Sequence, residues 1–418
     1  MKKIISFIVI CSLITMQLTA APIKIVDTTY EEELLESVGI TEYSLVTEES
    51  WYFSKDGIDK TAKKMVEKLP ASEEVILYGI SLGGTVARRM TQIAKDNGKK
   101  VKGYIAQSSP LSGDRLTNTG WAVTSLALLG IYSFIGLNNL FWGLPLESFL
   151  KGEITNEDYD LYNQLDENSK ALIKTCENGR NPKIVDRNNE QSIIENTTLP
   201  LLDAVFGSDE KGRGMSDYFG AVFSKGNNVK DLDPLGDFME DVMNSSSSKQ
   251  KEATDEIKRA FIVSTNGNIY ESSAWENVEP IMRYYQKQRD SYWAKAKKQW
   301  WLFVYWSLRA AASAVSVETI EGLPRAWSTC VSGSLDYSTN DGFVPAKDTF
   351  WGKELKMTAP NMRSILDKSF TCNKVSHVDY GEGLNSLPSK KGRTYSRKQS
   401  LEQQKEAILK AYNFIEND

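Results

Sequence analysis

The 418-residue sequence is poor in the side chains that hold metals and in the glycine patterns that hold nucleotides. It has one histidine and four cysteines, with no H-x-x-x-H and no paired C-x-x-C, which excludes the common zinc-site patterns. Neither a Walker loop nor a G-x-G-x-x-G run occurs, so the sequence predicts no cofactor and no metal. Acidic residues outnumber basic ones, 55 to 50, which argues against nucleic acid as the main partner.

The first 20 residues have the pattern of a secretory signal peptide. Lys2 and Lys3 form a basic start, residues 4–14 are mostly apolar, and Leu18-Thr19-Ala20-Ala21 offers small residues for cleavage. The apolar run is too short to span a membrane. We therefore expect residues 1–20 to be removed and the protein to be secreted or periplasmic. Loss of the two lysines leaves 48 basic against 55 acidic residues, a mature charge of −7.

Three cysteines follow the predicted signal peptide: Cys176, Cys330 and Cys372. In an oxidising compartment one pair can form a disulfide. Cys330 and Cys372 lie just upstream of the acid and histidine motifs described below, so a bond between them would tie two loops together. Three free, buried thiols are the alternative, and the sequence leaves the choice open.

A glycine-flanked serine, Ser81, lies between a predicted strand and a predicted helix. Residues 74–78 are apolar and β-prone, and a helical pattern occupies residues 85–95. Glycines two positions before and after Ser81 complete a G-x-S-x-G pentapeptide and permit a tight, strained turn that exposes the hydroxyl. In such a turn the backbone N–H of Leu82 faces a developing oxyanion. The pattern predicts that Ser81 is a nucleophile.

The single histidine, His377, follows an aspartate, Asp341, in the run Asn340-Asp341-Gly342-Phe343-Val344-Pro345. Histidine suits proton transfer near neutral pH, and the order serine, acid, histidine is that of the α/β-hydrolase triad. A histidine alone would more often be an ordinary core or surface residue, but its order after the other two motifs favours catalysis. We expect Ser81, Asp341 and His377 to be catalytic. The rival acids are Asp336, Asp348 and Asp379, and Asp341 is preferred because Gly342 permits a tight turn.

The order of predicted elements indicates an α/β fold with a doubly wound, mostly parallel sheet. Strands and helices alternate up to the serine motif, a helix pattern closes the chain at 398–414, and strand character is expected at 328–334. Residues 118–325 are mostly helical in pattern. We therefore expect an α/β-hydrolase core of residues 21–117 and 326–418, with a helical cap or lid of residues 118–325 over Ser81.

Two aromatic stretches of this insertion bear on the substrate. Residues 121–142 are almost uncharged, and residues 291–317 contain four tryptophans among basic side chains. Such a mixture suits a boundary between apolar and wet phases, so Trp300 and Trp301 are candidates to line an acyl-binding cleft or to touch a lipid surface. The alternative, favoured on composition, is that both stretches are core helices of the cap. A membrane span at residues 121–142 is a third interpretation.

The serine motif resembles the nucleophile elbow of the α/β-hydrolase superfamily, and of its lipases and esterases in particular. The residues that carry the resemblance are Gly79-Ile80-Ser81-Leu82-Gly83-Gly84 with Thr85-Val86-Ala87-Arg88. Ser109-Pro110-Leu111-Ser112-Gly113 is similar to a loop of lipases and of GPI-inositol-deacylase-like hydrolases. The resemblance covers residues 22–117 and 326–400. Ile80 stands where lipases often have histidine, and the His-Gly loop that supplies a second oxyanion donor is missing.

This resemblance implies an enzyme that cleaves carboxylic esters, with a lipid-like substrate, through an acyl-enzyme and without a cofactor. The oxyanion donors would be Leu82 and, by position only, a residue near Thr28. An acyltransferase or thioesterase with the same triad is the nearest alternative. A non-catalytic protein that binds a lipid or a partner on a hydrolase scaffold is another, although the complete set of three residues argues against it.

Overall fold

The computed structural model describes most of the chain after the predicted signal peptide. The described residues are 21–26, 29–47, 55–130, 156–167, 169–170, 186, 188–206, 214–223, 228–245, 247, 257–271, 274–349, 366–377 and 397–417. The predicted signal peptide, Thr28, Cys176 and Asp379 lie outside these ranges, and so do residues 131–142 of the first aromatic stretch.

Six parallel strands form one sheet within the described residues, in the order β2-β1-β3-β4-β5-β6. They are β1 (Ile23–Ile25), β2 (Tyr43–Leu45), β3 (Glu74–Ile80), β4 (Lys100–Gln107), β5 (Lys258–Ser264) and β6 (Asp367–Cys372). The inner strands β3 and β5 are buried over nearly their whole length, as expected for parallel strands covered on both faces. The predicted class, a doubly wound parallel α/β fold, is confirmed.

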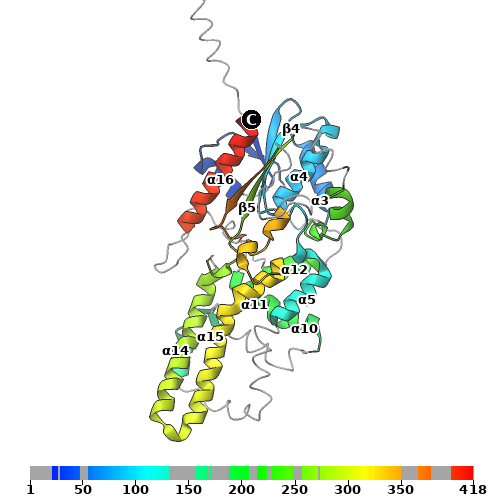
Figure 1. The fold of residues 1–418 in the computed structure, drawn as a ribbon. Helices are drawn as coiled ribbons and strands as arrows, with labels where there is room; N and C mark the ends of the chain where they lie inside the picture. The colour runs from blue at the N-terminus through cyan, green and yellow to red at the C-terminus, as the bar shows by residue number, and fades with distance from the viewer. Residues whose placement is uncertain are drawn as a thin grey trace, which may run out of the picture.

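Helices cover both faces of the sheet because successive strand residues point to opposite sides. Val75 and Leu77 of β3 share a core with α3 (Ile58–Glu67) and α4 (Leu82–Ala94). Ile76 and Tyr78 share the other core with α2 (Thr29–Ser37) and α16 (Arg397–Asn417). Figure 1 shows α16 on one face of the sheet and α3 and α4 on the other.

The remaining helices form a separate part of the molecule, below the sheet in Figure 1. They are α5 (Thr119–Gly130), α8 (Asn156–Asn163), α10 (Glu190–Ile193), α11 (Leu199–Phe206), α12 (Met215–Phe223), α14 (Ala274–Lys298) and α15 (Phe303–Ser332). Their common core includes Leu126, Leu202, Phe219 and Trp327. The long helices α14 and α15 pack side by side as a hairpin that projects away from the sheet. Within the described ranges, no helix combines the length and apolar character that crossing a membrane requires.

The expectation that residues 118–325 form a mostly helical insertion outside the sheet does not hold at β5. This strand pairs with β4 on one side and β6 on the other, so residues 258–264 belong to the sheet. A short apolar run cannot be distinguished from a buried helix segment by its periodicity, and the two charged residues at its start weaken the strand signal further. The helical part is therefore built from two stretches of chain that flank β5.

The strand predicted at residues 328–334 is also wrong, because residues 328–332 form the end of α15 and the last two follow it. Trp327, Cys330 and Val331 have the i, i+3, i+4 spacing of a helix face and are buried in the helical core. Gly333 then ends the helix with φ 74°, and its N–H donates to the carbonyl oxygen of Thr329. Burial of this face outweighs the strand preference of the β-branched residues in the run.

Cys330 and Cys372 are free thiols, so the disulfide considered from the sequence does not form. Cys330 lies on α15, where its Sγ contacts the carbonyl oxygen of Ser125, and Cys372 ends β6 near the carbonyl oxygen of Gln403. The two side chains belong to different hydrophobic clusters, one in the helical part and one behind the sheet.

Candidate active site

Ser81 occupies the sharp turn between β3 and α4. The strand ends at Ile80 and the helix begins at Leu82, so Ser81 alone connects them. Its backbone has φ 52° and ψ −128°, a conformation that is unfavourable for a residue with a Cβ and that persists mainly at functional sites. The Ser81 N–H donates to the carbonyl oxygen of Gln107 at 2.9 Å, which ties the turn to the end of β4.

Glycines allow the strand and the helix to approach each other this closely. A Cβ atom on Gly79 would lie 2.3 Å from the carbonyl carbon of Gly83. A Cβ atom on Gly84 would lie 2.0 Å from Oγ of Ser109 and 2.9 Å from the carbonyl oxygen of Gly79. These distances are shorter than any real Cβ contact, so side chains at these two positions are incompatible with the turn.

His377 reaches Ser81 from the loop that follows β6. Its Nε2 lies 3.0 Å from Ser81 Oγ, although the two residues are 296 positions apart in the chain. The backbone N–H of His377 donates to the carbonyl oxygen of Asp341 at 2.7 Å, and Ser376 Oγ donates to the same oxygen at 3.1 Å. The histidine loop is thus held directly on the aspartate loop.

Asp341 holds the other side of the imidazole. Its Oδ2 lies 2.9 Å from Nδ1 of His377, and its side chain is only 1% exposed. Oδ1 accepts the backbone N–H groups of Phe343 and Val344 at 3.0 and 2.8 Å. This turn requires Gly342, which has φ 102°. One carboxylate oxygen is therefore fixed by the backbone, and the other orients the histidine ring.

Of the other acids considered from the sequence, Asp336 does not take this place, and Asp379 lies outside the described residues. Asp336 begins the 3₁₀ turn Tyr337–Thr339 and accepts the backbone N–H of Ser338. The carboxylate that is hydrogen-bonded to Nδ1 of His377 is that of Asp341. Sequence order and the glycine after Asp341 therefore select the carboxylate that the structure brings to the imidazole.

Aromatic side chains connect the helical part to the loop of Asp341 and to His377. The indole N–H of Trp327, on α15, donates to the carbonyl oxygen of Gly342 at 2.6 Å. The ring of Phe343 lies 5.3 Å from the imidazole of His377 and also contacts Trp327 and Phe206 of α11. No sequence pattern indicates the roles of Trp327 and Phe206. The position of Phe343, two residues after Asp341, was the one available hint.

Two further carboxyl groups, Asp114 and Asp348, are buried in the structure, and of these only Asp348 was a candidate from the sequence. Burial raises the pKa of Asp114 to about 7, although hydrogen bonds from the Leu116 N–H and the Tyr218 hydroxyl oppose the shift. The charges of Asp348 and His377 act on Asp114 in opposite directions. Burial likewise raises the pKa of Asp348 to about 6. Asp114 is close enough to His377 for its carboxyl to feel the imidazole charge, and no hydrogen bond between the two is described.

Of the two proposed oxyanion donors, Leu82 lies within the described residues and Thr28 does not. Leu82 is the first residue of α4, so its N–H is one of those at a helix start that have no acceptor within the helix. This N–H lies beside the Ser81 hydroxyl at the positive end of the helix dipole. Thr28 lies outside the described residues, and the second donor is unassigned.

Trp300 and Trp301 do not belong to this site. They lie in the 3₁₀ turn Trp300–Leu302, which joins α14 to α15 at the end of the hairpin farthest from the sheet (Figure 1). Both side chains are exposed. The interpretation that they line an acyl path to Ser81 is therefore wrong, since aromatic composition alone cannot distinguish a cleft wall from an exposed turn.

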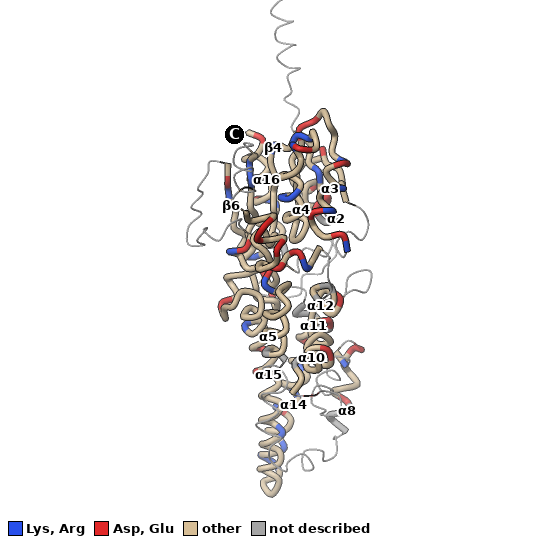
Figure 2. The backbone as a smooth tube through the Cα atoms, turned by 90° about the vertical axis from the view of Figure 1, so that its right-hand side faces the viewer, with Lys and Arg blue, Asp and Glu red and all other residues tan. Residues whose placement is uncertain are grey.

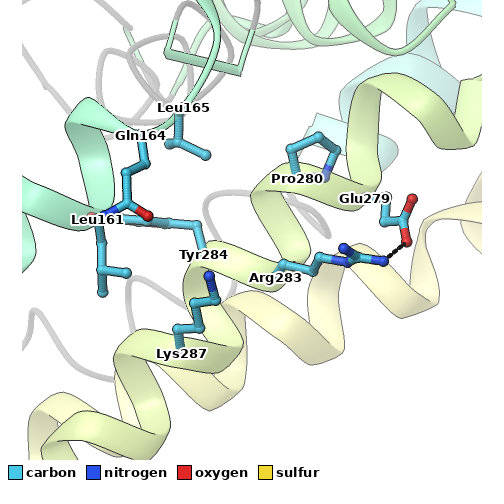
Figure 3. Close-up of a pocket in the computed structure, with 8 residues that line it drawn as sticks. All are labelled: Leu161, Gln164, Leu165, Glu279, Pro280, Arg283, Tyr284 and Lys287. Carbon is cyan, nitrogen blue, oxygen red and sulfur yellow. Dashed lines mark hydrogen bonds and ion pairs between the residues drawn. The ribbon is translucent and has the colours of Figure 1, made fainter.

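Among the described residues, two pockets can be named near or within the helical part. One, of about 810 Å³, is lined by Arg115, Trp121, Lys347 and Asp348 among others, and lies where α5 meets the α/β unit. The other, of about 260 Å³, lies between α8 and α14, and Figure 3 shows Arg283 on its wall paired with Glu279. Neither pocket is lined by a residue of the triad.

The chemistry available at the site follows from its hydrogen bonds. A hydroxyl, an imidazole and a buried carboxylate in series can activate the hydroxyl as a nucleophile and stabilise the protonated imidazole that results. Among the described residues, no group of three or more His, Cys, Asp or Glu side chains is placed to hold a metal ion.

One family model matches the chain, and it does so over the segment that carries the serine turn. Residues 45–130 match the PGAP1-like alpha/beta domain, which covers about a fifth of the chain and includes β3, Ser81, α4 and β4 but neither Asp341 nor His377. No curated protein and no solved structure matches significantly. The family is lipase/esterase-like, which indicates a hydrolase-type function related to lipids. Residues 45–130 therefore match the PGAP1-like alpha/beta domain, a lipase/esterase-like hydrolase family, and they lie within a parallel α/β fold.

Proposed function

We propose that the protein is a secreted serine hydrolase that cleaves carboxylic esters of lipid-like substrates through an acyl-enzyme. The observation that carries the proposal is the hydrogen-bonded series from Ser81 Oγ to His377 Nε2 at 3.0 Å and from His377 Nδ1 to Asp341 Oδ2 at 2.9 Å. The strained backbone of Ser81 adds support, because such strain is typical of a nucleophile elbow.

In the proposed reaction, Ser81 Oγ attacks the ester carbonyl carbon while His377 Nε2 takes the hydroxyl proton. Asp341 keeps the Nδ1 proton on the side facing its carboxylate and stabilises the imidazolium. The N–H of Leu82 donates to the carbonyl oxygen as it becomes negative. The C–O bond to the alcohol then breaks, and His377 returns the proton to the leaving oxygen. Water attacks the acyl-enzyme with His377 again acting as base, which releases the acid and restores Ser81.

A lipid-like acyl group is proposed because an aromatic cluster contacts His377 and the matching family is lipid-related. Phe343 contacts the imidazole, and Phe206 and Trp327 lie behind it. Each methylene that is buried against such a wall contributes about 0.8 kcal/mol, so four more carbons can raise kcat/KM by up to about two orders of magnitude. Replacement of these aromatic side chains should remove the increase in kcat/KM with acyl length.

The test is a series of p-nitrophenyl esters from butanoate to decanoate, assayed with the wild type and with Phe343→Ala and Ser81→Ala variants. We expect the wild type to prefer decanoate, Phe343→Ala to lose much of that preference, and Ser81→Ala to lose about 10⁴-fold in kcat. Preference for butanoate that Phe343→Ala leaves unchanged would contradict the lipid-like substrate but not ester hydrolysis. Equal hydrolysis by Ser81→Ala would contradict the enzyme assignment itself.

Secretion is part of the same proposal and rests on the pattern of residues 1–20. The measurement is the N-terminal sequence of the protein recovered outside the cytoplasm, which is expected to begin at or near Ala21. Recovery of the intact N-terminus from the cytoplasm would contradict it.

A further inference from the structure

The turn of the α14–α15 hairpin presents five consecutive apolar side chains to solvent. They run from Trp300 to Val304, and their exposed fractions range from 39% at Leu302 to 78% at Trp300. The turn is at the far end of the hairpin from the sheet (Figure 1). A run of this length on the surface of a folded protein is unfavourable in water and is a mark of an interaction site.

These five residues, the hairpin tip, do not serve the packing of the hairpin itself. A separate small core of Tyr292, Ala296, Trp306 and Ala310 joins the two helices just behind the tip. Within it, Trp306 stacks on Tyr292 at 5.7 Å, and its indole N–H donates to the side chain of Gln299 at 2.8 Å. The hairpin is thus closed by buried residues next to the tip, and the exposed ones are held in a defined position without being needed for closure.

The charge around the hairpin tip is wholly positive. Residues 291–317 contain Lys295, Lys297, Lys298 and Arg309 and no acidic residue, whereas the chain as a whole carries a net charge of −5. Lys295 and Arg309 lie over the aromatic rings of the small core. Lys297 and Lys298 are exposed at the end of α14. Figure 2 shows the basic segment of α14 in blue above an end of the hairpin that has no red.

We propose that the hairpin tip docks on the surface of a lipid bilayer that carries anionic headgroups. Tryptophan and phenylalanine side chains partition to the boundary between headgroups and acyl chains, where Trp300, Trp301 and Phe303 would be buried. Lys297 and Lys298 would then lie among the phosphates, where each lysine near an anionic surface strengthens binding. The combination of an apolar tip and an adjacent basic ring fits this partner better than a neutral protein surface.

Docking through the tip is distinct from acyl binding at the triad. Phe303 and Trp327 are 24 residues apart on α15, which is about 36 Å along a helix axis. Trp327 contacts the loop of Asp341, so the triad stands well away from the tip. The tip therefore attaches the molecule to the bilayer and does not line the path to Ser81. The inference does not rest on the proposed hydrolysis, since it can be measured in a protein that lacks the serine hydroxyl.

The experiment is flotation of the full chain carrying Ser81→Ala with vesicles of phosphatidylcholine alone or with 30% phosphatidylglycerol. We expect binding to the anionic vesicles to be about 30-fold tighter, the combined effect of two lysines near an anionic surface. Lys297→Gln with Lys298→Gln should abolish this preference. Trp300→Ser with Trp301→Ser should weaken binding to both vesicles by about tenfold or more. The matched control is Leu335→Ser, a substitution at a residue that is 68% exposed elsewhere on the surface, and it should leave binding unchanged.

Two results would overturn the proposal. The first is that the protein with an unaltered hairpin tip binds neither kind of vesicle. The second is that replacing Trp300 and Trp301 leaves vesicle binding unchanged. Sedimentation velocity without lipid examines the alternative that the tip binds a second copy of the chain. A dimer that dissociates on substitution of Trp300 and Trp301 would assign the tip to a subunit interface instead. Hydrolysis of short soluble esters by the Ser81-intact tip variants reports on folding and tests the proposed enzyme separately.

Discussion

Asp114→Asn should change the pH dependence of stability, because the wild-type carboxyl is buried where its charged form is disfavoured. Burial raises the pKa of Asp114 from the ordinary 3.8 to about 7. Between these values the unfolded chain releases the proton while the folded protein retains it. The free energy of unfolding therefore falls as pH rises, by about 1.4 kcal/mol per pH unit, and the full loss of about 4 kcal/mol is reached above pH 7. Asparagine is neutral throughout and avoids this loss.

The replacement preserves the hydrogen bonds that the site offers. Asparagine Oδ1 can accept the hydrogen bond from the Leu116 N–H. In the wild type the Tyr218 hydroxyl donates to the aspartate, and in the variant the amide nitrogen can donate to that hydroxyl instead. The assay is urea unfolding of both proteins at pH 5 and pH 8. The stability of the variant relative to the wild type should rise by about 3 kcal/mol between these pH values. A relative stability that stays constant, or that falls with pH, would refute the assignment of a buried, protonated carboxyl.

Three further predictions concern the turn at Ser81, the loop of Asp341 and the two described cysteines. Gly84→Ala should destabilise the fold by about 3 kcal/mol or prevent folding, since its Cβ would overlap a neighbouring side chain. Gly220→Ala, which meets no atom within 4 Å, should leave the melting temperature unchanged or raised. Trp327→Phe removes the donor to the carbonyl oxygen beside the catalytic acid, so we expect a loss of about 1–3 kcal/mol in stability and a lower kcat. Unaltered kcat would show that the acid loop needs no support from α15. Cys330 and Cys372 should react with a thiol reagent only after unfolding, because both are buried and burial raises the pKa of each to about 12. If the protein is denatured without a reductant and these two cysteines still do not react, they are not free thiols and the prediction is wrong.

Much of the site could be predicted because its requirements are local. The turn at Ser81 needs residues without side chains on both sides, and the turn at Asp341 needs a positive φ at Gly342, so both leave a mark in the sequence. With one histidine in the chain, no choice of partner remained. The supporting residues leave no such mark. Trp327 and Asp114 acquire their positions from long-range packing, and their neighbours in the sequence give no indication of it.

The fold could be predicted where strands and helices alternate and could not where packing decides. The alternation before β4 predicts a parallel sheet, which the structure has. The sequence pattern does not predict β5, because its apolar part is only four residues long and such a run can be a buried strand or part of a helix. The β-branched residues at the end of α15 favour a strand, but the burial of Trp327 and Val331 on one face stabilises the helix.

The central claim is that Ser81 is a nucleophile activated by His377 and Asp341, and covalent labelling with a fluorophosphonate tests it most directly. Mass spectrometry of the labelled wild type is expected to find one adduct, on the peptide that contains Ser81. Ser81→Ala should show none, His377→Ala should label far more slowly, and Ser316→Ala, a helix-surface control on α15, should label as the wild type does. Equal labelling of the wild type and Ser81→Ala, or an adduct on another residue, would contradict the account.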